Sequence, residues 1–150
     1  MPNKLLLRKA NPSDAKAIHN LIVDLAIFEK EPNAVKTSVE DYRIGLEIHQ
    51  FDAILAVDEN DHILGMAFFY PTFSTWSGKA LYLEDFIVKE EFRGKGIGKQ
   101  LFEAYLAEAK RQNAKICRWQ VLDWNEVGKS FYRKYKVEVH LGWENWIIRM

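Results

Sequence analysis

The chain has 150 residues, of which 48% are hydrophobic, so it is long enough for one globular domain with a sizeable core and too short for two. Basic and acidic residues number 21 each, and this zero net charge argues against non-specific binding to nucleic acid or to an anionic membrane. No apolar run approaches the ~18 residues that span a bilayer, and the first residues lack the apolar core of a secretory signal. We therefore expect a cytoplasmic protein.

The first half of the chain alternates between strand and helix patterns. Residues 4–10 predict a short strand, and "NPSD" then predicts a helix start with Asn11 as N-cap and Pro12 in the first turn. Apolar residues at helical spacing continue this helix toward Pro32, and a second helix is expected from Ser38, with Thr37 as the other cap candidate. Residues 51–57, 63–70 and 79–88 are apolar runs of strand length, joined first by the turn sequence "DENDH", and they indicate an antiparallel meander.

The second half carries the clearest helix. Its apolar face is formed by Ile97, Leu101, Tyr105, Leu106 and Ala109, and Lys99 and Glu103 form an exposed pair four residues apart. Residues 115–122 then read as a strand, 125–135 as a short helix, and 137–141 and 145–150 as closing strands. The fold class is α/β, or α+β with a mixed sheet and flanking helices, in which the strand-helix-strand unit 81–122 has parallel strands.

Cysteine and histidine offer little chemistry. The one cysteine, Cys117, has no partner for an internal disulfide and no metal-ligand spacing around it, so we expect a small buried side chain and no metal site. The four histidines are dispersed along the chain and are expected at the surface or in packing.

The glycine-rich turn "RGKGIG" stands between a strand and the long helix. Gly94, Gly96 and Gly98 allow close approach to backbone amides, and the helix start adds a positive dipole end, which together suit a phosphate group. The spacing fits neither a dinucleotide fingerprint, which needs glycine at Lys99, nor a Walker loop, which needs glycine at Arg93. The alternative is that these glycines only shape a turn.

Two adjacent acids, Glu84 and Asp85, interrupt an otherwise apolar strand. A carboxylate inside a strand is costly to bury without a partner, and a bound ammonium is one such partner. Adjacent strand residues point to opposite faces, so both acids can face one site only if a β-bulge intervenes. The alternative is that one or both acids pair with Lys or Arg within the fold.

These motifs together resemble the GCN5-related N-acetyltransferase (GNAT) superfamily. The turn matches its pyrophosphate signature, and "TWSGKALYLEDFIV" and "WNEVGKSFY" are similar to the diamine branch, which includes spermidine/spermine and thialysine acetyltransferases. The resemblance covers nearly the whole chain. It implies a single domain over residues 1–150 with a GNAT-like fold, in which a central, mostly antiparallel sheet contains a splayed pair of parallel strands.

The resemblance implies acetyl-CoA as the acyl donor. The strand with Phe86, Ile87 and Val88 and the strand with residues 118–120 would splay apart and leave backbone groups for the pantetheine arm. The pyrophosphate would lie on the turn formed by Arg93, Gly94, Lys95, Gly96, Ile97, Gly98 and Lys99. Asn125, Glu126 and Gly128 would contact the far side of the cofactor, although Asn125 also suits the N-cap of the short helix.

The resemblance also implies the proton-transfer groups. Glu84 would act as general base, through water, and Tyr132 as the acid that protonates the departing thiolate. From periodicity alone Tyr132 reads as a packing residue, like Phe131 and Tyr135 beside it.

The substrate is expected to be a small primary amine that attacks directly in a ternary complex. Its binding residues would be Asp85, Phe28, Glu29, Trp76 and Trp119, which combine negative charge with aromatic surface. Phe28 stands where diamine acetyltransferases commonly have tyrosine, which leaves a polyamine, a shorter diamine and thialysine all open. Acetylation of a protein lysine or an aminoglycoside, and a non-catalytic acyl-CoA-binding module, are the alternatives.

The aromatic C-terminal sequence "GWENWIIRM" suits a sheet edge that pairs with a second subunit. We therefore expect a homodimer.

Overall fold

A computed structural model describes residues 4–150, and the chain divides into two compact units, Met1–Gln120 and Val121–Met150. Among the described residues, none of the helices combines the length and the apolar character that crossing a bilayer requires.

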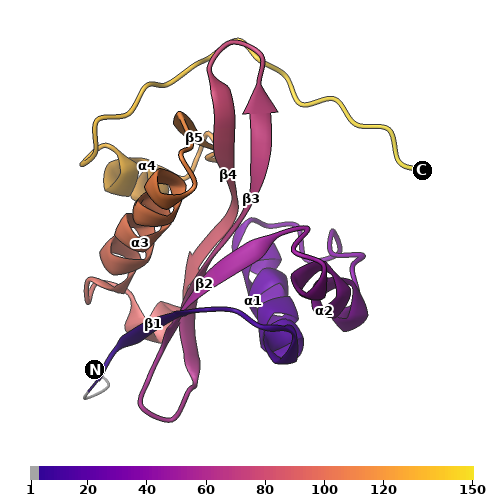
Figure 1. Ribbon diagram of the computed structural model, residues 1–150, viewed down its shortest axis with the longest axis vertical. Helices are drawn as coiled ribbons and strands as arrows, with labels where there is room; N and C mark the ends of the chain where they lie inside the picture. Colours follow the sequence, from indigo (N-terminus) through magenta and orange to yellow (C-terminus); the bar gives the residue numbers. More distant parts are fainter. Residues whose placement is uncertain (1–3) are drawn as a thin grey trace. The chain divides into compact units, whose positions relative to one another are not determined.

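The first unit is built on a five-stranded sheet in the order β1-β2-β3-β4-β5 (Figure 1). Its strands are β1 (Leu6–Lys9), β2 (Asp52–Val57), β3 (Ile63–Ser74), β4 (Gly78–Val88) and β5 (Ile116–Trp119). Neighbouring strands from β1 to β4 are antiparallel, whereas β4 and β5 are parallel because a helix connects them. The predicted mixed, mostly antiparallel sheet is confirmed.

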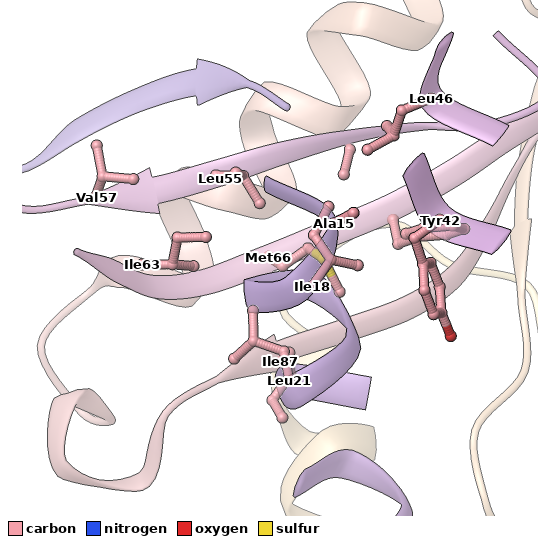
Figure 2. Close-up of a cluster of buried hydrophobic side chains, with 12 residues drawn as sticks. Ala15, Ile18, Leu21, Tyr42, Leu46, Leu55, Val57, Ile63, Met66 and Ile87 are labelled. Atoms are coloured by element: carbon pink, nitrogen blue, oxygen red, sulfur yellow. The ribbon is translucent and has the colours of Figure 1, made fainter. Parts of the chain in front are cut away.

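Helices α1 (Ala15–Phe28) and α2 (Val39–Glu47) pack together on one side of the strands (Figure 1). Asn11 caps a single 3₁₀ turn, η1 (Pro12–Asp14), that leads into α1, and Ser38 caps α2 in a reciprocal pair with Asp41. These two starts agree with the sequence, but α1 ends at Phe28, before Pro32 is reached. Figure 2 shows the apolar cluster that fixes these helices, with Ile18 and Leu21 of α1 against Met66 and Ile87 of the sheet.

Helix α3 (Ile97–Arg111) packs on the opposite side of the sheet (Figure 1). It buries Ile97, Leu101, Tyr105 and Ala109, as its periodicity predicts, while Leu106 is only partly buried. The Tyr105 hydroxyl donates a 2.6 Å hydrogen bond to the Leu81 carbonyl oxygen and so ties the helix to β4. This contact joins the middle of α3 to the first half of β4.

The second unit contains α4 (Glu126–Tyr132), which confirms the predicted short helix. The predicted closing strands over 137–141 and 145–150 are wrong, because the structure assigns no strand to residues 137–150. Strand-like spacing of apolar residues marks a face but supplies no hydrogen-bonding partner, and a strand exists only in a ladder. The large apolar side chains of this segment are exposed, as Trp143, Trp146 and Ile148 show.

Candidate functional site

A one-residue bulge lies where the two acids interrupt β4. Phe68 of β3 pairs with Asp85, and the next residue, Phe69, pairs with Leu83. Glu84 is therefore the extra residue, with no partner opposite it. The protein thus contains the bulge that the two acids require if both are to face one site.

The bulge turns both acids to the side of the sheet that carries α1 and α2. Asp85 pairs with Phe68, which belongs to the core cluster beneath these helices and contacts the Tyr42 ring of α2. Glu84 accepts a 2.7 Å hydrogen bond from the hydroxyl of Tyr70, which lies two residues beyond Phe68 on the same strand and hence on the same face. Without the bulge, Glu84 and Asp85 would face opposite sides.

The acids at this face are short of positive charge. Burial, and then the charges of Glu84 and Glu29, raise the pKa of Asp85 to about 7. Burial also raises the pKa of Glu29 above its ordinary value. Within residues 4–150, no lysine or arginine forms an ion pair with Glu84, Asp85 or Glu29, so the alternative of structural pairing is not what the protein shows.

The end of α1 brings two more predicted residues to this region. Phe28 is the last residue of α1 and Glu29 its C-cap. The Arg93 guanidinium lies over the Phe28 ring at 5.3 Å from its centroid, and Arg93 Nε donates to the Val88 carbonyl oxygen at 2.8 Å. The structure thus brings Phe28 and Glu29 near the bulge and near the first residue of the glycine-rich turn.

Two of the predicted substrate-binding residues lie elsewhere. Trp76 is at the tip of the β3–β4 hairpin, where it is 92% exposed, and β4 runs on from there before it reaches Glu84. Trp119 contacts the Phe102 ring of α3, at 5.4 Å between centroids, and so lies on the face of the sheet opposite the acids. In this structure neither tryptophan joins Glu84 and Asp85.

The parallel pair opens where the glycine-rich turn begins. β5 pairs with β4 only from Ala80 to Leu83, while β4 continues to Val88 with β3 on its other side. The edge of β4 that carries Phe86, Ile87 and Val88 is therefore not covered by β5. This is the splayed geometry expected of the fold.

The turn itself has the features that a phosphate group requires. Gly94 and Gly96 have φ of 75° and 82°, and no atom lies within 4 Å of the position where either would carry a Cβ. Gly96 is the N-cap of the 15-residue helix α3 and provides no side chain to satisfy its first amides, which begin at Ile97. Lys95 and Lys99 are exposed here, Lys99 4.0 Å from Glu103. These residues fit the diphosphate of an acyl-CoA.

The second unit holds the remaining predicted residues. The Asn125 side chain accepts a 3.0 Å hydrogen bond from the Gly128 amide, so it caps α4. Glu126 lies 3.4 Å from the Lys129 ammonium. Tyr132 ends the helix, with its ring 5.3 Å from that of Phe131, and burial raises the pKa of its phenol. A phenol with a raised pKa stays protonated at neutral pH and can donate a proton.

Sequence reasoning missed Tyr70 and Tyr82. Both read as ordinary strand aromatics, yet they pair directly across β3 and β4 and stack with centroids 5.5 Å apart, beside Glu84. Counting residues back from the hairpin tip places them opposite each other, and this is the signal that could have found them. Among the described residues there is no cluster of three or more His, Cys, Asp or Glu side chains that could hold a metal ion.

Residues 16–136 match the model of the acetyltransferase (GNAT) family. The protein belongs to this family. It is accordingly a GNAT-type N-acetyltransferase, a class of enzymes that take the acyl group from acetyl-CoA.

Its relatives are consistent with the diamine branch. The chain is 32% identical over 138 residues to the thialysine N-epsilon-acetyltransferase of Bos taurus, covering 86% of this chain and 81% of the relative. It is 29% identical to the human spermidine/spermine N(1)-acetyltransferase-like protein 1, over 84% of this chain and 19% of that one. An aminoglycoside acetyltransferase from a soil metagenome, solved with trehalose, shares the fold with a TM-score of 0.83 at 21% identity over 98% of both chains.

The pKa of Asp85 makes stability depend on pH. This carboxyl has a pKa of about 7 when folded, against an ordinary 3.8, so between these values the folded protein keeps a proton that the unfolded chain loses. The free energy of unfolding from this group therefore falls as the pH rises from about 4 to 7. We expect Asp85→Asn to be more stable than the wild type at about pH 8, by on the order of 1–3 kcal/mol, and the gap to close toward pH 4.

Urea unfolding across this pH range measures the difference. Glu103→Gln changes an exposed carboxylate on α3 and keeps Asp85. The difference between the stability of this variant and that of the wild type should therefore stay the same across the pH range. If the Asp85→Asn and wild-type stabilities stay parallel with pH, Asp85 is not held in its protonated form.

Proposed function

We propose that this protein transfers the acetyl group of acetyl-CoA to a primary amine of a small polyamine, diamine or thialysine-like substrate, by direct attack in a ternary complex. The observation that carries the proposal is the set of acids on one face of the sheet, Glu84, Asp85 and Glu29, for which the described residues supply no ion-pair partner. A substrate with positive charge would supply it. The similarity to thialysine N-epsilon-acetyltransferases supports the same substrate class.

Glu84 serves as the general base in this proposal. An alkylamine with pKa ~10.4 is about 3.4 units from its free-base form at neutral pH, which costs roughly 4.6 kcal/mol. Glu84 is exposed at the bulge, so a water molecule can reach its carboxylate and pass on the proton of the ammonium. Loss of that proton leaves the amine nitrogen with the lone pair that it needs for attack.

Asp85 and Glu29 hold the substrate's charge. Asp85 has a raised pKa because it is buried near two other acids, and an ammonium group close to it would favour its ionised form. Phe28, beside Glu29, offers apolar surface to the aliphatic part of the substrate. The proposal keeps Trp76 and Trp119 as substrate-binding residues. Trp76 would have to reach the substrate from the tip of the β3–β4 hairpin, and Trp119 from the face of the sheet that carries α3.

The residues that would hold acetyl-CoA are those of the open edge and the turn. Backbone groups of Phe86, Ile87 and Val88 would bond the pantetheine arm, and the segment from Arg93 to Lys99 would receive the pyrophosphate. Asn125, Glu126 and Gly128 would make further contacts. When bound, acetyl-CoA supplies an activated acyl group to the amine.

Tyr132 serves as the general acid. Its phenol keeps its proton at neutral pH because burial raises its pKa, and the hydroxyl would donate that proton to the departing thiolate.

The proposal also takes residues 1–150 as a single acetyltransferase domain of a cytoplasmic protein that forms a homodimer.

Steady-state turnover with acetyl-CoA and a panel of amines tests the activity. We expect CoA release with spermidine, putrescine, thialysine or a related small amine, and a loss of kcat of about 10²-fold or more in Glu84→Gln and in Tyr132→Phe. Glu103→Gln, a carboxylate change on the exposed side of α3, should keep wild-type turnover.

Other outcomes point to other functions. Turnover only with a peptide lysine or an aminoglycoside would keep the reaction and replace the substrate. Binding of acetyl-CoA without turnover of any amine, or unchanged kcat in both variants, would favour a non-catalytic acyl-CoA-binding protein.

The turn is tested by Gly96→Ala. Gly96 has a φ of 82°, which a residue with a Cβ adopts at a cost of about 1 kcal/mol, so the N-cap of α3 should shift away from the geometry that receives the phosphates. We expect the KM for acetyl-CoA to rise by roughly 10-fold with little change in the KM for the amine. Gly142→Ala, at a φ of 90° in the other unit, is the matched control for backbone strain. Equal KM values in both variants would contradict a role for this turn.

The homodimer is tested by the mass of the protein in solution and by substitutions in the C-terminal segment, residues 137–150. Trp143, Trp146 and Ile148 are exposed large apolar residues in residues 137–150, and such patches mark interaction surfaces. Size-exclusion chromatography with light scattering should give twice the mass of the 17.6 kDa chain, and replacement of these three residues by serine should shift the protein toward the monomer. Val127→Ser removes another exposed apolar side chain and should not. A strictly monomeric wild type would rule the dimer out.

A further inference from the structure

Tyr70 occupies a special place next to the bulge. It pairs with Tyr82 across β3 and β4, and the two rings stack at 5.5 Å with an angle of 28° between their planes. Pro71 follows Tyr70. The pairing of β3 with β2 stops at Phe69, which lies opposite Asp52, so β2 does not pair with Pro71. Both the stacked ring and the constrained residue after it limit how far the Tyr70 side chain can move.

The Tyr70 hydroxyl donates a hydrogen bond to Oε2 of the Glu84 carboxylate at 2.7 Å. Glu84 is the unpaired residue of the bulge and is exposed, so the sheet gives its side chain little support. Among the described residues, Tyr70 provides the one side-chain hydrogen bond that Glu84 receives.

We propose that Tyr70 is a positioning residue for the reaction, which holds Glu84 by one carboxylate oxygen so that the other oxygen is left to accept the proton of the amine. The inference depends on the proposed function, because it takes Glu84 as the base. A carboxylate on a flexible three-bond side chain samples several rotamers, and a short hydrogen bond to a ring that is itself stacked selects one of them. Tyr70 acts through Glu84 and makes no contact with the amine in this scheme.

Tyr70→Phe tests the proposal because it keeps the stacked ring and removes only the hydroxyl. We expect kcat to fall about 10-fold with the KM for acetyl-CoA unchanged. Tyr82→Phe, which removes the neighbouring hydroxyl and leaves the Tyr70–Glu84 bond, should behave as wild type. In a Glu84→Gln background, Tyr70→Phe should have no further effect on kcat.

A spectroscopic measurement tests the same contact without turnover. In protein with ¹³C-labelled glutamate at one fixed pH, the carboxyl resonance assigned to Glu84 should shift in Tyr70→Phe and stay at the wild-type position in Tyr82→Phe. Thermal unfolding of the same samples shows whether the variants are folded.

The outcomes separate the two proposals. If Glu84→Gln is inactive but Tyr70→Phe shows the wild-type kcat and the wild-type Glu84 resonance, the role of Tyr70 is overturned and the proposed function stands. If Tyr70→Phe lowers kcat equally in the Glu84→Gln background, Tyr70 does not act through Glu84. If the wild type acetylates no amine, the proposed function fails and the role of Tyr70 in catalysis fails with it.

Discussion

One extra residue in β4 decides where the negative charge of this protein lies. A regular strand would send Glu84 and Asp85 to opposite faces, one under α1 and α2 and the other under α3. The bulge at Glu84 instead places both on the side of α1 and α2, where Asp85 is partly buried and its burial, together with the charges of Glu84 and Glu29, raises its pKa. An antiparallel ladder accepts this irregularity because the pairing resumes on either side of the bulge.

The same strand also shapes the other candidate subsite. β4 extends beyond its parallel partner β5, which pairs only with Ala80 to Leu83, and the chain then enters the glycine-rich turn and α3. Arg93 links these parts, since it bonds the Val88 carbonyl oxygen at the end of β4 and covers the Phe28 ring at the end of α1. The acids, the open edge and the turn are therefore successive features of one segment, and a change in β4 would affect all of them.

Much of this fold could be predicted because local signals and packing agree. Asn11 and Ser38 are caps by residue type as well as by geometry, and α3 buries the stripe that its spacing indicates. Even the bulge was foreseeable, because two adjacent acids in a buried strand have few other solutions. The prediction of closing strands in residues 137–150 was wrong for the opposite reason. The spacing of apolar residues is a local property, whereas a strand also needs a neighbouring strand to hydrogen-bond with, and local sequence does not specify that neighbour.

The candidate site likewise has some features that depend on local sequence and others that depend on contacts between distant segments. By itself the sequence determined the chemical groups, their order along the chain and the glycine-rich turn before the long helix, since these depend on residue type and near neighbours. Only the tertiary structure decided that Trp119 lies across the sheet from the acids, that Trp76 projects from a hairpin tip, and that Tyr70 reaches Glu84. Which face a side chain occupies depends on strand register, and register is set by pairing between segments that are distant in sequence.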